Sequence, residues 1–181
     1  MKKDFLNQYQ SVYFIGIGGI SMSGLAEILL SKGFQVSGSD MKESTETQHL
    51  RNIGIKVNIG HKAENITDDI QLVIYTAAIQ QDNIELIAAK QKNITIIDRA
   101  QLLGMIMQQY PYSVAISGTH GKTTTTGMIS DILLSTNADP TITVGGILPT
   151  IHSNTKIGGN SYFIAEACEY FDSFLQFYPL I

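Results

Sequence analysis

Two glycine-rich loops constrain the fold of this chain more than any other feature. Residues 12–15 and 112–117 are short apolar runs, and each is followed by one of these loops and then by a stretch with helical spacing of apolar residues. A strand–loop–helix unit of this kind directs backbone N–H groups and the positive end of a helix dipole toward one point, where an anion can bind. The pattern therefore predicts an α/β protein with two phosphate-binding units in series.

Strand and helix patterns alternate along the rest of the chain as well. Strands are expected at residues 12–15, 34–38, 56–59, 71–76, 94–97, 112–117, 142–144 and 162–165, and helices at 22–32, 44–53, 83–92, 99–109 and 122–135. This alternation implies parallel sheets that are covered by helices on both faces. Residues 145–154 are expected to form a loop because they contain Gly145, Gly146, Pro149 and Asn154.

The domain boundary is expected near Pro111, which follows a polar segment and disfavours helix in the residue before it. Residues 1–109 are then expected to form a Rossmann-like parallel-sheet domain. Residues 110–181 are expected to form the first part of a P-loop α/β domain. The last residues of the chain are apolar and carry no helix stop, which suggests a cut rather than a natural end.

Composition excludes several classes of protein. The net charge is −4, from 12 basic and 16 acidic residues, so the chain carries no global electrostatic footprint for nucleic acid. A single cysteine, Cys168, excludes an intrachain disulfide and a cysteine-rich zinc module. The N-terminus lacks the apolar core of a secretory signal, and no apolar run approaches the ~18 residues of a membrane span. A cytoplasmic protein without a membrane partner is expected.

The second loop, residues 117–126, carries the strongest functional pattern. Gly118 and Gly121 allow the backbone to wrap around an anion, Lys122 can reach the β- and γ-phosphates of a nucleotide, and the Thr123 hydroxyl can ligate Mg²⁺. The strict G-x-x-x-x-G-K-[ST] pattern is not met, because Ile116 occupies the position of its first glycine. The alternative is an ordinary turn with a capping threonine and a solvated lysine.

An acidic partner for the metal is expected at the carboxyl end of a neighbouring strand, where parallel sheets bind ligands. Glu166 follows the apolar run 162–165 and is the first candidate to hold Mg²⁺ together with Thr123. Glu169 is the second candidate. Both could instead be solvated loop acids, and for Glu169 that is the favoured interpretation.

The first loop is a weaker pattern when it is considered alone. Gly16 and Gly18 form a G-x-G sequence, but Ser21 stands where the dinucleotide fingerprint has its third glycine. Asp40 follows the second strand, at the position of an acid that reads a ribose. A structural tight turn is the alternative. Together the two loops indicate one diphosphate-bearing substrate and one ATP, whereas an NAD-dependent oxidoreductase has no need of the second loop.

These segments resemble the Mur ligase family of peptidoglycan synthesis, in the same order and over the whole chain. The Gly-Thr-His-Gly-Lys-Thr-Thr run at 118–124 is similar to the ATP loop of that family, and segment 14–27 resembles the opening loop of its alanine-adding branch. Residues 37–40 and 76–79 are similar to two further loops of the family. Residues 166–169 and 173–175 are similar to the segment that carries its Mg²⁺-binding glutamate.

The resemblance implies a role for each matching position. ATP would lie on Gly118, Thr119, His120, Gly121, Lys122, Thr123 and Thr124, with Lys122 as the catalytic residue and with Mg²⁺ on Thr123 and Glu166. The UDP-sugar would lie on Gly16, Ile17, Gly18, Gly19, Ser21, Met22, Ser23, Ser39, Asp40, Thr76, Ala77, Ala78 and Asn154. His61 and His120 would either touch substrate or be polar loop residues.

The activity implied by the resemblance is ATP-dependent ligation of L-alanine to the lactyl carboxylate of UDP-N-acetylmuramate through an acyl phosphate. A related ligase that adds a peptide or another amino acid is one alternative, and a non-catalytic nucleotide- or NAD-binding module is another. Members of the family continue through the rest of the ATPase domain and a C-terminal domain. The chain is therefore expected to be an N-terminal fragment that binds the UDP-sugar but does not ligate.

Overall fold

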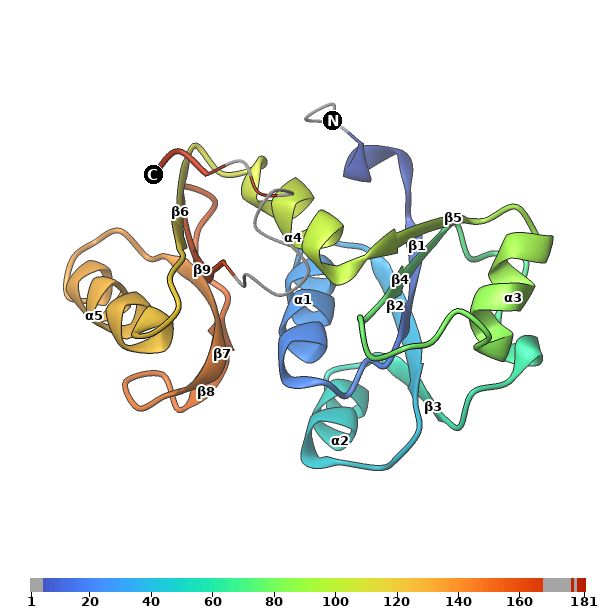
Figure 1. The fold of residues 1–181 in the computed structure, drawn as a ribbon. Coiled ribbons are helices and arrows are strands. Elements are labelled where there is room, and N and C mark those ends of the chain that lie inside the picture. Colours follow the sequence, from blue (N-terminus) through green and yellow to red (C-terminus); the bar gives the residue numbers. More distant parts are fainter. Residues whose placement is uncertain (1–4, 168–176, 178) are drawn as a thin grey trace. The chain divides into compact units, whose positions relative to one another are not determined.

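The computed structural model describes residues 5–167, 177 and 179–181, and these form two compact units (Figure 1). The first unit spans Asn7–Arg99, and the second contains Ala100–Ile181 together with Phe5 and Leu6. Helix α4 (Arg99–Met107) begins at the division between them. The predicted domain boundary after residue 109 remains a prediction.

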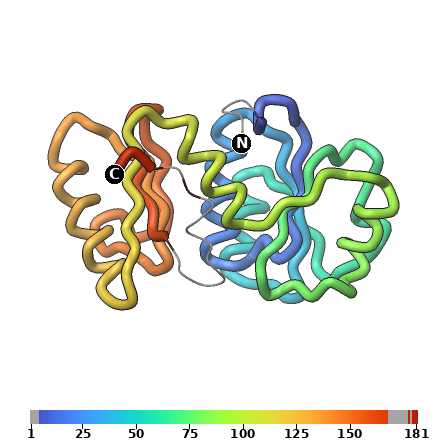
Figure 2. The backbone as a smooth tube through the Cα atoms, turned by 45° about the horizontal axis from the view of Figure 1, so that its top comes forward, coloured from blue at the N-terminus to red at the C-terminus, as the bar shows by residue number. Residues whose placement is uncertain are grey.

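The first unit is a fully parallel five-stranded sheet in the order β3-β2-β1-β4-β5. Its strands are β1 (Ser11–Ile15), β2 (Gln35–Asp40), β3 (Lys56–Ile59), β4 (Leu72–Tyr75) and β5 (Thr95–Asp98). Its helices are α1 (Ile20–Ser31), α2 (Thr45–Asn52) and α3 (Ile84–Gln91), with the 3-10 turn η2 (Ala63–Asn65); the 3-10 turn η1 (Leu6–Gln8) begins at the division between the units. Helices α1 and α2 lie on one face of the sheet and α3 lies on the other (Figures 1 and 2).

Local sequence explains where these elements begin. All five residues of β1 are buried, as expected for the central strand of a sheet that is covered on both faces. Helix α2 begins with a capping box, in which Ser44 Oγ accepts from the Thr47 N–H at 3.2 Å and the Ser44 N–H donates to Thr47 Oγ1 at 2.8 Å. The Asn83 side chain caps α3 by accepting from the Glu85 N–H at 2.9 Å.

The second unit is a four-stranded sheet in the order β6-β9-β7-β8. Strands β6 (Tyr112–Ile116), β9 (Tyr162–Glu166) and β7 (Thr141–Leu148) are parallel, and β8 (Ser153–Lys156) is antiparallel to β7. Helix α5 (Lys122–Leu134) packs Ile129 and Leu133 onto a core that contains Ile116, Ile142 and Ile164. The predicted α/β architecture of parallel strands and covering helices is thus confirmed.

The structure corrects one prediction for the second unit. Gly145 and Gly146 are not in a loop but lie inside β7, and Asn154 lies in β8. The pairing of β7 with β8 shifts register between Thr143 and Leu148. Such an irregularity accommodates two consecutive glycines within a strand, whereas a sequence pattern of this kind normally signals a turn.

Among the residues that the structure describes, no helix is long and apolar enough to cross a membrane.

Candidate functional site

The first glycine loop turns sharply at the carboxyl end of β1. Gly16 has a φ of 83°, and the N–H groups of Gly16 and Ile17 both donate to the carbonyl of Ser39, at 2.8 and 2.9 Å. A Cβ added at Gly16 would lie 2.8 Å from Thr76 Cγ2. Glycine is therefore required at position 16 by its backbone conformation and by the close approach of Thr76.

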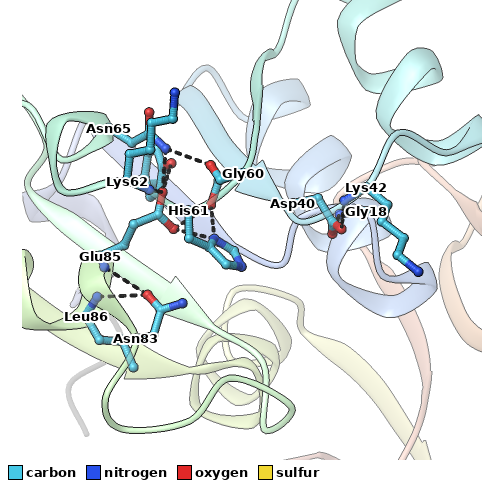
Figure 3. A network of polar contacts seen from close by, with 12 residues as sticks. Gly18, Asp40, Lys42, Gly60, His61, Lys62, Asn65, Asn83, Glu85 and Leu86 are labelled. Atoms are coloured by element: carbon cyan, nitrogen blue, oxygen red, sulfur yellow. Dashed lines mark hydrogen bonds and ion pairs between the residues drawn. The ribbon is translucent and has the colours of Figure 1, made fainter.

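Asp40 forms a hydrogen bond with the first glycine loop, beside which it was predicted to lie. Its Oδ2 accepts from the Gly18 N–H at 2.9 Å and its Oδ1 accepts from the Lys42 N–H at 3.3 Å (Figure 3). A Cβ on Gly18 would lie 2.9 Å from Asp40 Oδ2, so the carboxylate and the loop approach each other closely only because residue 18 is glycine. The carboxylate thus organises the loop backbone, and its contact with a ribose remains a prediction.

Helix α1 begins directly after this loop without the usual capping groups. Its N-cap is Gly19, which provides no side-chain hydrogen bond, and its first turn contains no acidic residue. Ser21 in that turn accepts a hydrogen bond from Arg99 Nη1 at 3.1 Å. Met22 and Ser23 are buried, and Ser23 Oγ donates to the Ile20 carbonyl at 2.9 Å.

The small-residue turn after β4 lies beside the same loop. The Ile79 N–H donates to the Thr76 carbonyl at 2.9 Å, and the side chains of both residues approach the position of a Cβ on Gly16. Ala77 and Ala78, between them, are exposed. The structure therefore brings the turns that follow β1, β2 and β4 together at one edge of the first sheet, as the family resemblance implied for the turn after β4.

A buried carboxylate that the sequence did not single out lies under this edge. Glu85 is 0% exposed, and its Oε1 accepts from the Tyr13 hydroxyl at 2.9 Å and from Asn65 Nδ2 at 2.6 Å. Its Oε2 lies 2.7 Å from His61 Nδ1 (Figure 3). The same oxygen accepts from Ser39 Oγ at 2.6 Å. Burial is the main reason that the pKa of the Tyr13 hydroxyl is raised well above its usual value.

The hydrogen bonds around Glu85 involve two residues, Ser39 and His61, for which the sequence suggested contacts with the substrate. The Ser39 side chain is fully buried, and this residue supports the loop through its carbonyl, as described above. The His61 side chain is 10% exposed and lies against Glu85. Direct contacts of these two residues with a ligand remain predictions. The only signal for Glu85 in the sequence is its place on the apolar side of α3, next to the buried Leu86.

The second glycine loop joins β6 to α5. Gly118 has a φ of 144°, and Gly121, the N-cap of α5, has a φ of 78°. Both values lie in the region that favours glycine. Lys122 Nζ donates to the Gly118 carbonyl across the loop. Thr119, His120, Thr123 and Thr124 are exposed, whereas Thr126 is buried and donates to the Lys122 carbonyl at 2.8 Å.

Glu166 ends β9 beside this loop, because it pairs in register with Ile116, the last residue of β6. Its Oε1 is buried without a hydrogen-bond partner among the described residues. A Cβ on Gly145 would lie 3.0 Å from Glu166 Oε2, and one on Gly146 would lie 3.7 Å from Thr123 Cγ2. Two adjacent glycines of β7 therefore lie next to Glu166 and Thr123, the two predicted metal ligands.

A hard cation fits this arrangement. A buried carboxylate oxygen that lacks a donor is costly, and a cation such as Mg²⁺ would satisfy it. No group of three acidic, histidine or cysteine side chains that could hold a metal occurs among the described residues. Glu169 and Cys168 lie outside the described residues.

Asn154 is placed in the second unit, on β8, where its Nδ2 donates to Thr155 Oγ1 at 3.2 Å. The other residues predicted to bind the UDP-sugar all belong to the first unit. Separately, the first unit has a polar groove of about 320 Å³ lined by residues of β1, β2 and β3, among them Ser11, Gln35 and Lys56. None of the predicted site residues lines this groove.

The fold and the two loops define an α/β protein with two strand–glycine loop–helix units. Comparison with known proteins specifies the family: the model described as "Mur ligase family, catalytic domain" matches residues 11–111. The chain belongs to the Mur ligase family.

Curated relatives are similar over almost the whole chain. It is 60% identical over 175 residues to the UDP-N-acetylmuramate–L-alanine ligase of Acetivibrio thermocellus, covering 97% of this chain and 37% of the relative. It is 58% identical over 181 residues to the enzyme of the same name from Clostridium kluyveri, covering 100% of this chain and 39% of the relative. The chain thus spans well under half of the length of these relatives.

Solved structures of Mur ligases are similar to most of this chain. The UDP-N-acetylmuramate–alanine ligase of Thermotoga maritima superposes with a TM-score of 0.82 at 34% identity, over 93% of this chain and 39% of that one. The UDP-N-acetylmuramate:L-alanyl-gamma-D-glutamyl-meso-diaminopimelate ligase of Neisseria meningitides superposes with a TM-score of 0.81 at 26% identity, over 90% of this chain and 53% of that one.

Proposed function

We propose that this chain is the N-terminal part of a ligase that joins L-alanine to the lactyl carboxylate of UDP-N-acetylmuramate in an ATP-dependent reaction. The observation that carries the proposal is the presence of one glycine loop of phosphate-binding form in each compact unit, at the carboxyl end of β1 and of β6. Relatives at 58–60% identity bear the name of that activity. A cytoplasmic location is part of the same proposal.

In the proposed reaction the second loop holds ATP. Lys122 would move from the Gly118 carbonyl to the β- and γ-phosphates, where its charge stabilises the transferring group. The lactyl carboxylate attacks the γ-phosphate, which releases ADP and leaves an acyl phosphate. The amine of alanine then attacks the acyl carbon, a tetrahedral intermediate collapses with loss of inorganic phosphate, and an amide is formed.

Thr123 and Glu166 are the residues of this chain that would hold Mg²⁺. The ion would supply positive charge next to the β- and γ-phosphates. The orphaned Oε1 of Glu166 supports this assignment, because a buried carboxylate without a donor is unfavourable until a cation arrives. No nucleophilic side chain is needed in the proposed mechanism.

The first loop would hold the diphosphate of the sugar nucleotide. Helix α1 begins directly after the loop, so the positive end of its dipole would attract the diphosphate, and Asp40 and Thr76 lie beside the loop. The relatives are longer, so we propose that this chain binds the UDP-sugar but needs the remaining part of such an enzyme in order to ligate.

A ligase that adds a peptide to the same sugar nucleotide is the second candidate. The observation that favours it is the similarity to the Neisseria enzyme, whose name includes a tripeptide. It ranks second because the identity to the alanine ligases is higher.

Calorimetric titration of the 181-residue chain tests the proposal. We expect UDP-N-acetylmuramate to bind and NAD to give no heat of binding. We also expect Lys122→Ala to abolish the binding of Mg·ATP without changing the affinity for the UDP-sugar. Tight NAD binding with no response to the UDP-sugar would refute the ligase and favour an oxidoreductase.

A further inference from the structure

Arg99 lies at the same edge of the first sheet as the glycine loop. It directly follows β5 and is the first residue of α4, whereas the loop follows β1 and the turn at Thr76 follows β4. In the sheet β4 lies between β1 and β5. From this position Arg99 Nη1 donates to Ser21 Oγ at 3.1 Å.

The contact with Ser21 places the Arg99 cation at the N-terminus of helix α1, which itself carries partial positive charge. Ser21 is in the first turn of α1, where the unpaired N–H groups already carry partial positive charge, so a guanidinium there is electrostatically unfavourable on its own. Helix α2 shows the usual arrangement, with a Ser44 cap and Glu46 in its first turn. Helix α1 has neither feature.

The guanidinium of Arg99 has no counter-charge in the part of the chain that the structure describes. Among the residues that the structure describes, no carboxylate forms an ion pair with it, although the residue is half-buried. The other arginine of the chain, Arg51, is paired with Glu43 at 2.5 Å and bonded to the Val57 carbonyl. Charge is therefore balanced around Arg51, whereas no described carboxylate balances the charge of Arg99.

We propose that Arg99 binds the diphosphate of the nucleotide that the first glycine loop accepts, and that Ser21 is its positioning residue. The inference rests on the proposed function and extends it to a side chain outside the loop. A planar guanidinium can donate two parallel hydrogen bonds to phosphate oxygens while helix N–H groups bind the same anion. This role explains why Ser21 replaces the third glycine of the fingerprint, because its hydroxyl accepts the hydrogen bond that orients the Arg99 guanidinium.

The test compares UDP with uridine as ligands of the 181-residue chain, by calorimetry or by competition with UDP-N-acetylmuramate. Arg99→Gln should weaken UDP binding by at least about tenfold and leave uridine binding unchanged, because only UDP carries the diphosphate. Ser21→Ala should weaken UDP binding less, by a few fold. Arg51→Gln is the matched control and should change neither affinity.

Thermal unfolding of each variant establishes that it is folded. Equal weakening of UDP and uridine by Arg99→Gln, or no weakening of UDP, would overturn the inference while leaving the proposed function intact. A wild-type chain that binds neither UDP nor UDP-N-acetylmuramate would overturn the proposed function and the inference with it. The UDP affinity of the wild type should also fall more steeply with salt than that of Arg99→Gln.

Discussion

Ser39 connects Glu85 to the first glycine loop. Its Oγ donates to Oε2 of Glu85 at 2.6 Å, and its carbonyl accepts the N–H of Gly16 at 2.8 Å. The position of the loop therefore depends on a carboxylate that is 0% exposed and belongs to α3. A substitution of Glu85 should therefore change both the stability of the first unit and the position of the first glycine loop.

Glu85→Leu should lower the free energy of unfolding by about 3 kcal/mol, because it leaves the hydroxyls of Tyr13 and Ser39 and the amide of Asn65 without their acceptor. Urea denaturation followed by circular dichroism measures the change. Glu64→Leu, at an exposed position in η2, is the control and should stay within about 0.5 kcal/mol of the wild type. Equal effects of the two substitutions would contradict the role given to the network.

Stability at alkaline pH should depend on Tyr13. The pKa of its hydroxyl is raised in the folded state above the usual 10.0, so the folded chain holds that proton more tightly than the unfolded chain. The resulting stability is complete below pH 10 and is lost as the pH rises above it. Tyr13→Phe should therefore flatten the fall of unfolding free energy above pH 10, whereas Tyr112→Phe, at an exposed position, should not.

Gly16→Ala and Gly60→Ala separate backbone strain from crowding. Both residues have a positive φ, 83° and 88°, but a Cβ at Gly16 would lie 2.8 Å from Thr76 Cγ2, whereas one at Gly60 would meet nothing within 4 Å. Gly60→Ala should cost roughly 1 kcal/mol of stability from strain alone, and Gly16→Ala clearly more. Thermal unfolding gives the comparison, and an equal cost at both positions would show that Thr76 moves aside freely.

The effect of Glu166→Gln on stability should change sign when Mg·ATP is added. Without Mg²⁺, the loss of a charge at a buried oxygen with no partner should leave stability unchanged or raise it by up to about 1 kcal/mol. With Mg·ATP, the wild type should gain stability by mass action and the variant should gain much less. The readout is the melting temperature at increasing Mg·ATP, with Glu64→Gln as control. A variant that responds as strongly as the wild type would remove Glu166 from the metal site.

Short-range patterns predicted most of the fold. Strand β1 could be recognised because an apolar run ends at a glycine, and α5 could be recognised because Gly121 and Lys122 follow a second such run. The position of Asp40 beside the first loop was predicted from the dinucleotide fingerprint, and that of Thr76 was implied by the family resemblance.

Long-range pairings could not be predicted in this way. The partners of Glu85 come from four segments, with Tyr13 at 72 residues, Ser39 at 46, His61 at 24 and Asn65 at 20 residues from it in the sequence. A helical pattern shows only that Glu85 is on one side of α3, and says nothing of the donors that allow it to be buried. Two consecutive glycines normally predict a loop. In β7 they are tolerated within a strand because the pairing with β8 is irregular there, which the sequence pattern does not reveal.

The outer edge of the second sheet is occupied by the last residues of the chain. The Leu180 N–H donates to the Ser113 carbonyl at 2.9 Å, and the Ala115 N–H donates to the Ile181 carbonyl at 2.9 Å. These backbone groups of β6 are consequently not open to a strand from a second molecule. An unprotected edge strand is a template for self-assembly, and at Ser113 and Ala115 this edge is paired with Leu180 and Ile181.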